Sequence, residues 1–293
     1  MPGRHRGVSG RRAPWRASPP RLATEHEEVA GGWRRYAHIL AVCWRAAVAQ
    51  QLEYRADLAA KTLTSAFWLA WAAVGVSVYF RFTGSIAGWS YGEVLVVVGL
   101  FFTVNGIRQA FFEPNLELMG EYVRRGTLDH VLTQPVDSQV LVSLRHVGMH
   151  NLVDPVLGLV LVGVGVGLSG RDVSVGGVAA FVLLLVAAVV LLYALVLALM
   201  GLAVLLVGAD ELGTVSFSVV ELSRFPVQAY GQPLQTVLVV VPVALLTTVP
   251  AMALLGRLEP VWLVASPAVA LLAVAGASLW WRRVLRRYTG ASA

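Results

Sequence analysis

Blocks of about twenty apolar residues, separated by short polar segments, form the main pattern along the chain. A helix needs about 20 apolar residues to cross a bilayer core, and the blocks lack the alternation that is typical of half-buried strands. We therefore predict an all-α integral membrane protein with six transmembrane helices. Five of the predicted spans are residues 62–80, 91–112, 152–168, 175–207 and 260–281.

The remaining predicted span falls in residues 213–255, where charged residues and prolines interrupt the apolar sequence. The interrupting residues are Glu221, Arg224, Pro226, Pro242 and Pro250. Proline costs about 3 kcal/mol inside a helix, and broken helices are tolerated at membrane depth where they pack within protein or line a cavity. Two assignments are open: either 213–230 is the fifth span and 234–255 is re-entrant, or 213–232 is re-entrant and 234–255 is the span.

The chain before the first predicted span divides into two segments. Residues 1–35 are rich in arginine and proline without an apolar run, which favours a basic disordered tail on the cytoplasmic side. Residues 36–61 carry apolar positions at helical spacing, interrupted by charged residues that include Glu53, Arg55 and Asp57. This pattern predicts an interfacial helix along the membrane surface. The membrane domain then covers residues 36–293.

The longest polar stretch between predicted spans, residues 113–150, is the one internal loop with room for a protein partner. Residues 115–125 are predicted to form a short helix that Gly126 stops. Thr127 can cap a second helical turn, which Pro135 ends because proline cannot continue a helix.

The placement of the basic residues decides between nucleic acid and membrane as the partner. The net charge of +6 would suggest nucleic acid in a soluble protein, but 57% of the residues are hydrophobic and only 14% are charged. Nineteen of the 23 basic residues fall in or beside the N-terminal segments, the 113–150 loop and the C-terminus, whereas Arg81, Arg171 and Arg257 fall on the opposite side. Because basic residues concentrate on the cytoplasmic side, both termini and the loop are predicted to be cytoplasmic. We expect a multi-pass plasma (inner) membrane protein that contacts lipid and no nucleic acid.

Common catalytic and nucleotide-binding motifs do not occur in the sequence. Lys61 is the only lysine and lacks the glycines of a phosphate-binding P-loop, and H-E-x-x-H, C-x-x-C and G-x-S-x-G are absent. The single cysteine, Cys43, allows no intramolecular disulfide. We expect no cofactor and no metal in this chain, so that an ion gradient or a partner supplies the energy for any transport.

Few ionisable residues fall within the predicted spans, where a buried charge is costly and marks a candidate pathway. The pathway candidates are Asn105, Arg108, Glu221 and Arg224. Arg108, like Asp154, lies near the end of its span and is expected to reach the interface, while Glu221 and Arg224 are expected to neutralise each other. Gly163 and Gly167 have a spacing that favours close helix packing in lipid.

Several short motifs follow one another at a characteristic spacing from Trp33 to the C-terminus. They are Glu53–Asp57 (EYRAD), Glu121–Asp129 (EYVRRGTLD), Gln134–Asp137 (QPVD), Phe225–Pro226, Val241–Pro242, Val249–Pro250, Gly256–Pro260 (GRLEP) and Trp281–Tyr288 (WRRVLRRY). Together with the six spans, they resemble the permease subunits of ABC-2 type exporters. The chain is most similar to the actinobacterial and cyanobacterial branch that is catalogued as a domain of unknown function.

The resemblance implies a transport subunit that dimerises with a second permease copy or a paralogue and binds two cytoplasmic ABC ATPase subunits, which hold ATP and Mg²⁺. The loop between the second and third spans would be the coupling helix, with coupling residues Glu121, Arg124, Arg125, Thr127, Leu128, Asp129 and Pro135. The resemblance also implies a re-entrant hairpin before the last span. We place it at 234–255, with arms that end at Pro242 and Pro250, and the fifth span at 213–230. The substrate does not carry over, because the substrates of the family are diverse.

Two other classes of protein stay open. A secondary transporter or channel would show paired repeats or more buried charge. A membrane-embedded lipid-modifying enzyme would need a nucleophile or a metal cluster, for which His130, His146 and His150 with Glu121 or Asp129 are imaginable ligands whose spacing matches no known site. The predicted outer loops are too short to dock a substrate-binding protein, which favours export.

Overall fold

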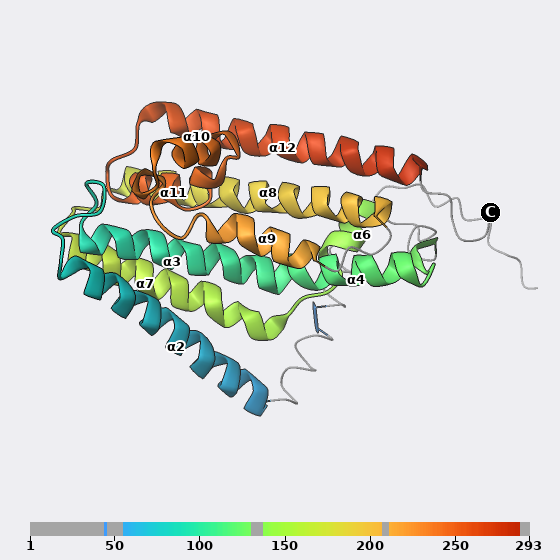
Figure 1. Ribbon diagram of the computed structural model, residues 1–293, viewed down its shortest axis with the longest axis horizontal. Helices are drawn as coiled ribbons and strands as arrows, with labels where there is room; N and C mark the ends of the chain where they lie inside the picture. Colours follow the sequence, from blue (N-terminus) through green and yellow to red (C-terminus); the bar gives the residue numbers. More distant parts are fainter. Residues whose placement is uncertain (1–43, 46–54, 130–136, 207–210, 288–293) are drawn as a thin grey trace, which may run out of the picture.

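The computed structural model describes residues 44–45, 55–129, 137–206 and 211–287. Within these ranges the chain folds into helices joined by short turns, and the long helices run side by side in one bundle (Figure 1). Five described helical segments are long and apolar enough to cross a membrane, and a bent pair of short helices raises the number to six if it counts as one span. The predicted all-helical, multi-pass architecture is confirmed. The long helices are α2 (Arg55–Phe80), α3 (Tyr91–Ile107), α7 (Val153–Ser169), α8 (Val175–Leu205) and α12 (Pro260–Arg287).

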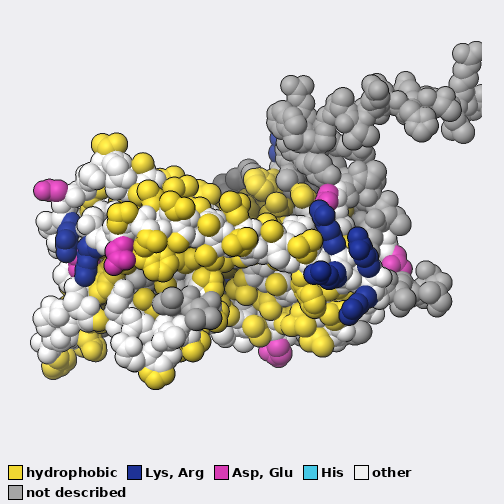
Figure 2. All heavy atoms as spheres, turned by 90° about the horizontal axis from the view of Figure 1, so that it is seen from above, with side chains coloured by type: hydrophobic (Ala, Val, Ile, Leu, Met, Phe, Trp, Pro, Cys, Tyr) yellow, Lys and Arg dark blue, Asp and Glu magenta, His cyan; other side chains and the backbone are white. Residues whose placement is uncertain are grey.

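The two ends of the bundle differ in how the helices are connected (Figure 1). The hairpin end holds three turns, at residues 81–90, 170–174 and 255–259. The opposite end, called the α4 end, holds α4 (Glu113–Arg124), α6 (Ser138–Leu144) and the last turns of α12. Figure 2 shows basic side chains gathered at both ends of the visible face, with hydrophobic side chains between them. An apolar belt between charged ends suits a bilayer.

The second membrane helix does not stop where its span was predicted to end. A π-helical segment, η1 (Arg108–Phe112), continues α3 into α4, so that one helical segment runs from Tyr91 to Arg124. Pro114 directly follows the start of α4 and has no amide hydrogen to donate. The helix therefore changes from α-helical to π-helical hydrogen bonding just before Pro114, the residue that cannot donate an α-helical hydrogen bond.

Residues 212–254 form a series of short helices. Helix α9 (Leu212–Glu221) begins at the α4 end, and the next elements lie nearer the hairpin end (Figure 1). They are η3 (Val227–Ala229), α10 (Gln232–Val240), η4 (Val243–Leu245) and α11 (Thr248–Leu254). The helices before and after Pro242 are bent by 69°. Pro250 lies at the third position of α11, where no intrahelical amide donor is needed, so the prediction that it ends a hairpin arm is wrong. Whether 234–255 is re-entrant stays a prediction.

Helix α2 begins earlier than the predicted first span. It starts at Arg55 and continues without a break past Lys61, although the interfacial helix was predicted to extend to residue 61. No glycine or proline separates the two segments, and a charged first turn at the membrane boundary does not interrupt helical hydrogen bonding. The other predicted interfacial residues, except Trp44 and Arg45, lie outside the described residues, as do Glu53 and the tail 1–35.

The contact between α3 and α7 depends on glycines at seven-residue spacing. A Cβ on Gly99 would lie 2.7 Å from the Gly158 carbonyl oxygen, and one on Gly165 would lie 2.7 Å from that of Gly92. The two backbones therefore touch along one face. Gly163 and Gly167 have open space where a side chain would stand, so the pair predicted to pack closely does not do so within the described chain.

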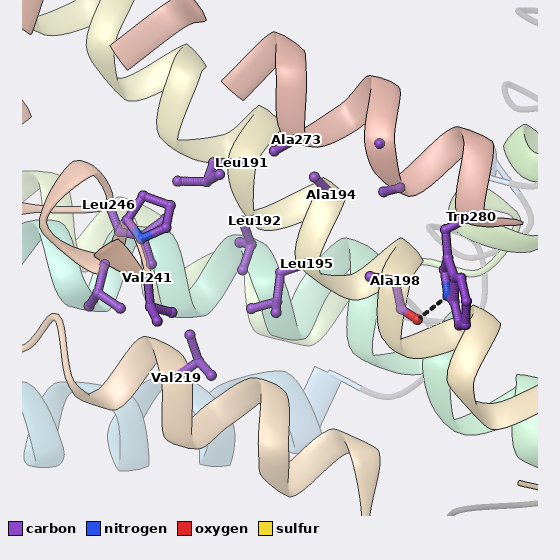
Figure 3. Close-up of a pocket in the computed structure, with 14 residues that line it drawn as sticks. Leu191, Leu192, Ala194, Leu195, Ala198, Val219, Val241, Leu246, Ala273 and Trp280 are labelled. Atoms are coloured by element: carbon purple, nitrogen blue, oxygen red, sulfur yellow. Dashed lines mark hydrogen bonds between the residues drawn. The ribbon is translucent and has the colours of Figure 1, made fainter. Parts of the chain in front are cut away.

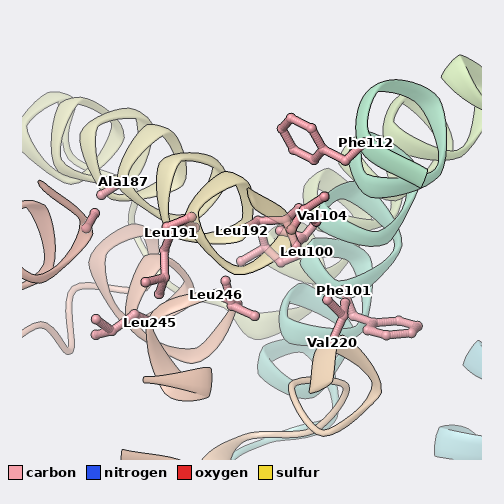
Figure 4. Close-up of a cluster of buried hydrophobic side chains, with 14 of the residues drawn as sticks. Leu100, Phe101, Val104, Phe112, Ala187, Leu191, Leu192, Val220, Leu245 and Leu246 are labelled. Atoms are coloured by element: carbon pink, nitrogen blue, oxygen red, sulfur yellow. The ribbon is translucent and has the colours of Figure 1, made fainter. Parts of the chain in front are cut away.

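The hydrophobic core lies between α3 and α8 and is closed by α9 and α11. Leu100 and Val104 of α3 face Leu192 of α8, while Val220 and Leu246 complete the cluster (Figure 4). Helix α3 is the most enclosed of the membrane-length segments, with 78% of its apolar window buried. It is therefore the central element on which the candidate site is built.

Candidate transport pathway and coupling segment

The end of α4 has the geometry that its sequence predicts. Gly126 has a φ of +65°, a left-handed conformation that glycine adopts without strain. Its amide donates to the Val123 carbonyl at 3.2 Å, and the Thr127 amide donates to the Tyr122 carbonyl at 3.0 Å. These two bonds form a Schellman motif, which confirms the predicted stop at Gly126.

A hydrogen-bonded junction fixes α4 against the segment that follows α6. The buried Asn115 side chain donates to the His146 carbonyl at 2.8 Å and accepts from the His146 amide at 2.9 Å. Burial and the neighbouring Arg145 lower the pKa of His146, which favours its neutral form. Asp137 caps α6 by accepting from the Gln139 amide at 2.9 Å. Helices α4 and α6 are thus held together at this end of the bundle, where Gln139 of α6 also donates to Tyr193 of α8 and to Ser278 of α12.

The described coupling residues differ in their exposure. Glu121, Arg124 and Arg125 lie at the end of α4, where Arg125 forms an ion pair of 2.8 Å with Glu121. Leu128 is fully buried and therefore anchors the segment to the core. Thr127 is exposed and Asp129 is half-buried. Pro135 lies outside the described residues, as does most of the helical turn predicted after Thr127.

Arg108 is buried in the fold, contrary to the prediction that it reaches the interface. Only 2% of it is exposed. Its guanidinium donates to Asn105 at 3.0 Å, to Glu113 at 3.1 Å and to the Ser216 hydroxyl at 3.0 Å. Three of its five N–H donors thus have acceptors inside the protein, one of them the carboxylate of Glu113, which compensates for the loss of water around the charge. Arg108 links α3, α4 and α9.

A polar cavity of about 320 Å³ lies between α2, α3, α7 and α9. It brings together three of the predicted pathway residues, Asn105, Glu221 and Arg224. Arg224 forms an ion pair of 2.7 Å with Glu221, which confirms their predicted mutual neutralisation. Lys61 and Asp154 line the same cavity and lie 3.9 Å apart. Two cations and two carboxylates therefore share this space.

An apolar cavity of about 410 Å³ lies between α8, α12 and the break after α10 (Figure 3). Leu191 and Leu195 line one wall, and Pro242 lines the end near η4. The Trp280 indole closes the other end and donates to the Ala198 carbonyl at 3.2 Å. This cavity suits hydrocarbon, whereas the cavity at Glu221 suits a molecule with charged or polar groups.

A comparison with protein families identifies the family of the chain. The sequence profile of the ABC-2 family transporter proteins matches residues 66–292. The chain belongs to this family. The resemblance drawn from the motifs is thereby confirmed, and the protein is an ABC-2 type permease, a membrane transport subunit that is not itself catalytic. Searches of curated proteins and of solved structures found no match.

The hairpin end of the ABC-2 permease is held together by Glu93, which is not among the predicted site residues. Glu93 is 2% exposed, and its carboxylate lies 2.9 Å from Arg171 and 3.0 Å from Arg257. The same carboxylate accepts from the Ser90 amide at 2.9 Å and completes a capping box. The spacing of Ser90 and Glu93 before an apolar run is the sequence signal that would have identified this residue.

The histidines that raised the possibility of a metalloenzyme are not brought together as ligands in the described permease. Among the described residues, no group of three histidine, cysteine, aspartate or glutamate side chains is placed to hold a metal ion. His146 contacts Asn115 through its backbone, and His130 lies outside the described residues. The polar cavity and α4 are the features on which a transport mechanism can be built.

Proposed function

We propose that this ABC-2 permease forms the membrane pathway of an ATP-driven exporter, together with a second permease chain and two ABC ATPase subunits. The observation that carries the proposal is the continuity of the helix from Tyr91 to Arg124. Its first half is the centre of the bundle, and its last turns carry Glu121 and Arg125 beyond the apolar belt. A displacement imposed at α4 is therefore transmitted into the membrane by one helical segment.

Arg108 gives this displacement a route to the cavity wall. It lies at the start of the π-helical segment and bonds Glu113 on the α4 side and Ser216 on α9. Helix α9 also carries Glu221, which lines the polar cavity. Movement of α4 would thus shift α9 through side chains that are already hydrogen-bonded, and would reshape the cavity that holds the substrate.

The proposed orientation places the α4 end and both termini in the cytoplasm. The basic residues support this orientation, because the hairpin end has only Arg81, Arg171 and Arg257 among the basic residues that the structure describes. Glu93 ties two of these arginines together and closes the hairpin end. The polar cavity lies beside Lys61 and Asp154, at the beginnings of α2 and α7. Loading from the cytoplasmic side suits an exporter.

A charge exchange on α4 tests the proposal. We would co-express the permease with ABC ATPases from the same organism and measure the ATPase that co-purifies through a tag on the permease. In a Glu121→Arg, Arg125→Glu double variant, the ion pair within the helix is kept but the surface charge is rearranged. We expect this variant to lose most of the bound ATPase.

The control is Arg81→Glu, which changes an exposed charge at the hairpin end and should leave ATPase binding unchanged. Equal ATPase recovery with wild type, the α4 double variant and the control would contradict the assignment of α4 as the coupling helix. Substrate transport that persists without any ATPase, driven by an ion gradient, would favour a secondary transporter.

A further inference from the structure

Asp154 has an unusual position in the wall of the polar cavity. Its side chain is only 9% exposed, and Oδ2 lies 3.9 Å from Nζ of Lys61. Its other oxygen, Oδ1, is buried and has no hydrogen-bond partner within the part of the chain that the structure describes. A buried carboxylate oxygen without a donor loses the free energy of hydration that it would have in water. A ligand with an N–H donor would recover part of that loss.

The other charges in the cavity leave Asp154 as the group that is least well neutralised. Glu221 has Arg224 at 2.7 Å, whereas Lys61 is 3.9 Å from Asp154 and 27% exposed. Electrostatic attraction and hydrogen bonding both weaken at the longer distance. The site near Asp154 therefore favours an additional positive charge over an additional negative one.

Aromatic side chains form the apolar part of the same cavity. Arg224 lies 5.6 Å from the Phe101 ring, and Arg108 lies 5.5 Å from the Phe217 ring. Trp68 and Phe102, which also line the cavity, provide further ring surface for a ligand. The volume of about 320 Å³ corresponds to roughly ten water molecules, enough for a polar head and a few carbons.

We propose that this cavity binds the primary ammonium group of an amphiphile, with the ammonium at Asp154 and the adjoining carbons against Trp68 and Phe102. A primary ammonium brings three N–H donors, and one of them can bond Oδ1 once the Asp154 carboxyl group turns that oxygen toward the cavity. A quaternary ammonium has the same charge but no donor. The amphiphile is either a free amine or a lipid with an ethanolamine head. Binding of the amine requires no ATPase and can be tested on the permease alone. Only the claim that the bound amphiphile is also exported rests on the proposed function.

Three probes of equal chain length separate charge from hydrogen bonding. Octylamine, octyltrimethylammonium and octanol would be added to the permease in phosphatidylcholine nanodiscs, and the rise in melting temperature would be measured against concentration. We expect octylamine to stabilise the wild type at concentrations where the other two have little effect. Asp154→Asn should weaken octylamine binding at least tenfold, while Glu259→Gln, an exposed change at the hairpin end, should leave it unchanged.

Lys61→Met should change octylamine affinity in the direction opposite to Asp154→Asn. A variant that merely damaged the fold would not bind octylamine more tightly. Removal of the internal ammonium frees Asp154 for the ligand, so octylamine should bind several-fold more tightly although the ion pair is lost. Equal responses to all three probes, or equal octylamine affinity in wild type, Asp154→Asn and Lys61→Met, would overturn the proposal. Weaker octylamine binding in nanodiscs that contain phosphatidylethanolamine would identify the lipid head as a ligand, and unchanged binding would favour a free amine.

Discussion

Glu93 and Arg257 are 164 residues apart in the chain, yet Oε2 of Glu93 lies 3.0 Å from a guanidinium nitrogen of Arg257. The Arg257 guanidinium also stands 4.8 Å from the centre of the Trp89 ring. Because Arg171 binds the other carboxylate oxygen, Glu93 joins all three turns of the hairpin end. Opening of this end requires that a buried carboxylate separates from two arginines.

Glu93→Gln should therefore destabilise the permease. The neutral amide leaves two arginines without their counter-charge, and because both arginines are partly exposed, we expect a cost of about 1–3 kcal/mol. Thermal unfolding in detergent would measure the change. Asp172→Asn removes an exposed carboxylate beside Arg171 and serves as the control. Similar melting temperatures for the two variants would show that Glu93 does not hold the hairpin end together.

Gly99→Ala should destabilise the contact between α3 and α7, because the new methyl group would meet the Gly158 backbone. Overpacking of this kind costs about 1–3 kcal/mol. Gly163→Ala lies on the same pair of helices but meets open space, and alanine is the better helix former, so it should be neutral or stabilising. Melting temperatures of the two variants would be compared with that of the wild type. An equal loss of stability in Gly99→Ala and Gly163→Ala would contradict the close contact assigned to Gly99.

The link between Arg108 and Ser216 can be measured by a double-mutant cycle. Arg108→Gln, Ser216→Ala and the double variant would be compared with wild type by chemical unfolding. A hydrogen bond to a charged group contributes about 1.5–3 kcal/mol, so we expect a coupling energy of about this size between α3 and α9. Strictly additive effects would mean that the two residues do not communicate.

Cysteine labelling tests the topology. In a Cys43→Ser background, cysteines at Ser85 and Gln232 should react with an impermeant thiol reagent in intact cells, and a cysteine at Arg125 should react only after permeabilisation. All three positions are exposed. Labelling of Gln232 only after permeabilisation would assign 234–255 as the fifth span. Reversed labelling of Ser85 and Arg125 would invert the whole topology.

The sequence predicts the long helices well because bilayer thickness sets their length and short polar turns mark their ends. Helix α8, predicted at 175–207, spans Val175–Leu205, and α7, predicted at 152–168, spans Val153–Ser169. The start of α2 was placed late because charged residues were taken as evidence against the membrane helix. A helix continues through such residues when they lie at its boundary with water.

The interior contacts could not be predicted from the local pattern. Arg108 finds its acceptor on Ser216, 108 residues later, so neither its burial nor its role follows from its place near a span end. Gly99 and Gly158 pack closely because two specific helix faces meet, whereas Gly163 has a suitable spacing but no neighbour. Glu221 and Arg224 were predictable as a pair because they are three residues apart on one turn.

The subunit composition of the purified complex tests the central claim most directly. The permease would be co-expressed with ABC ATPases from the same organism, and the intact complex would be weighed by native mass spectrometry. We expect two permease chains, or this chain with a paralogue, together with two ATPase chains. A permease that assembles without any ATPase, although the ATPase is present in excess and folded, would contradict the account.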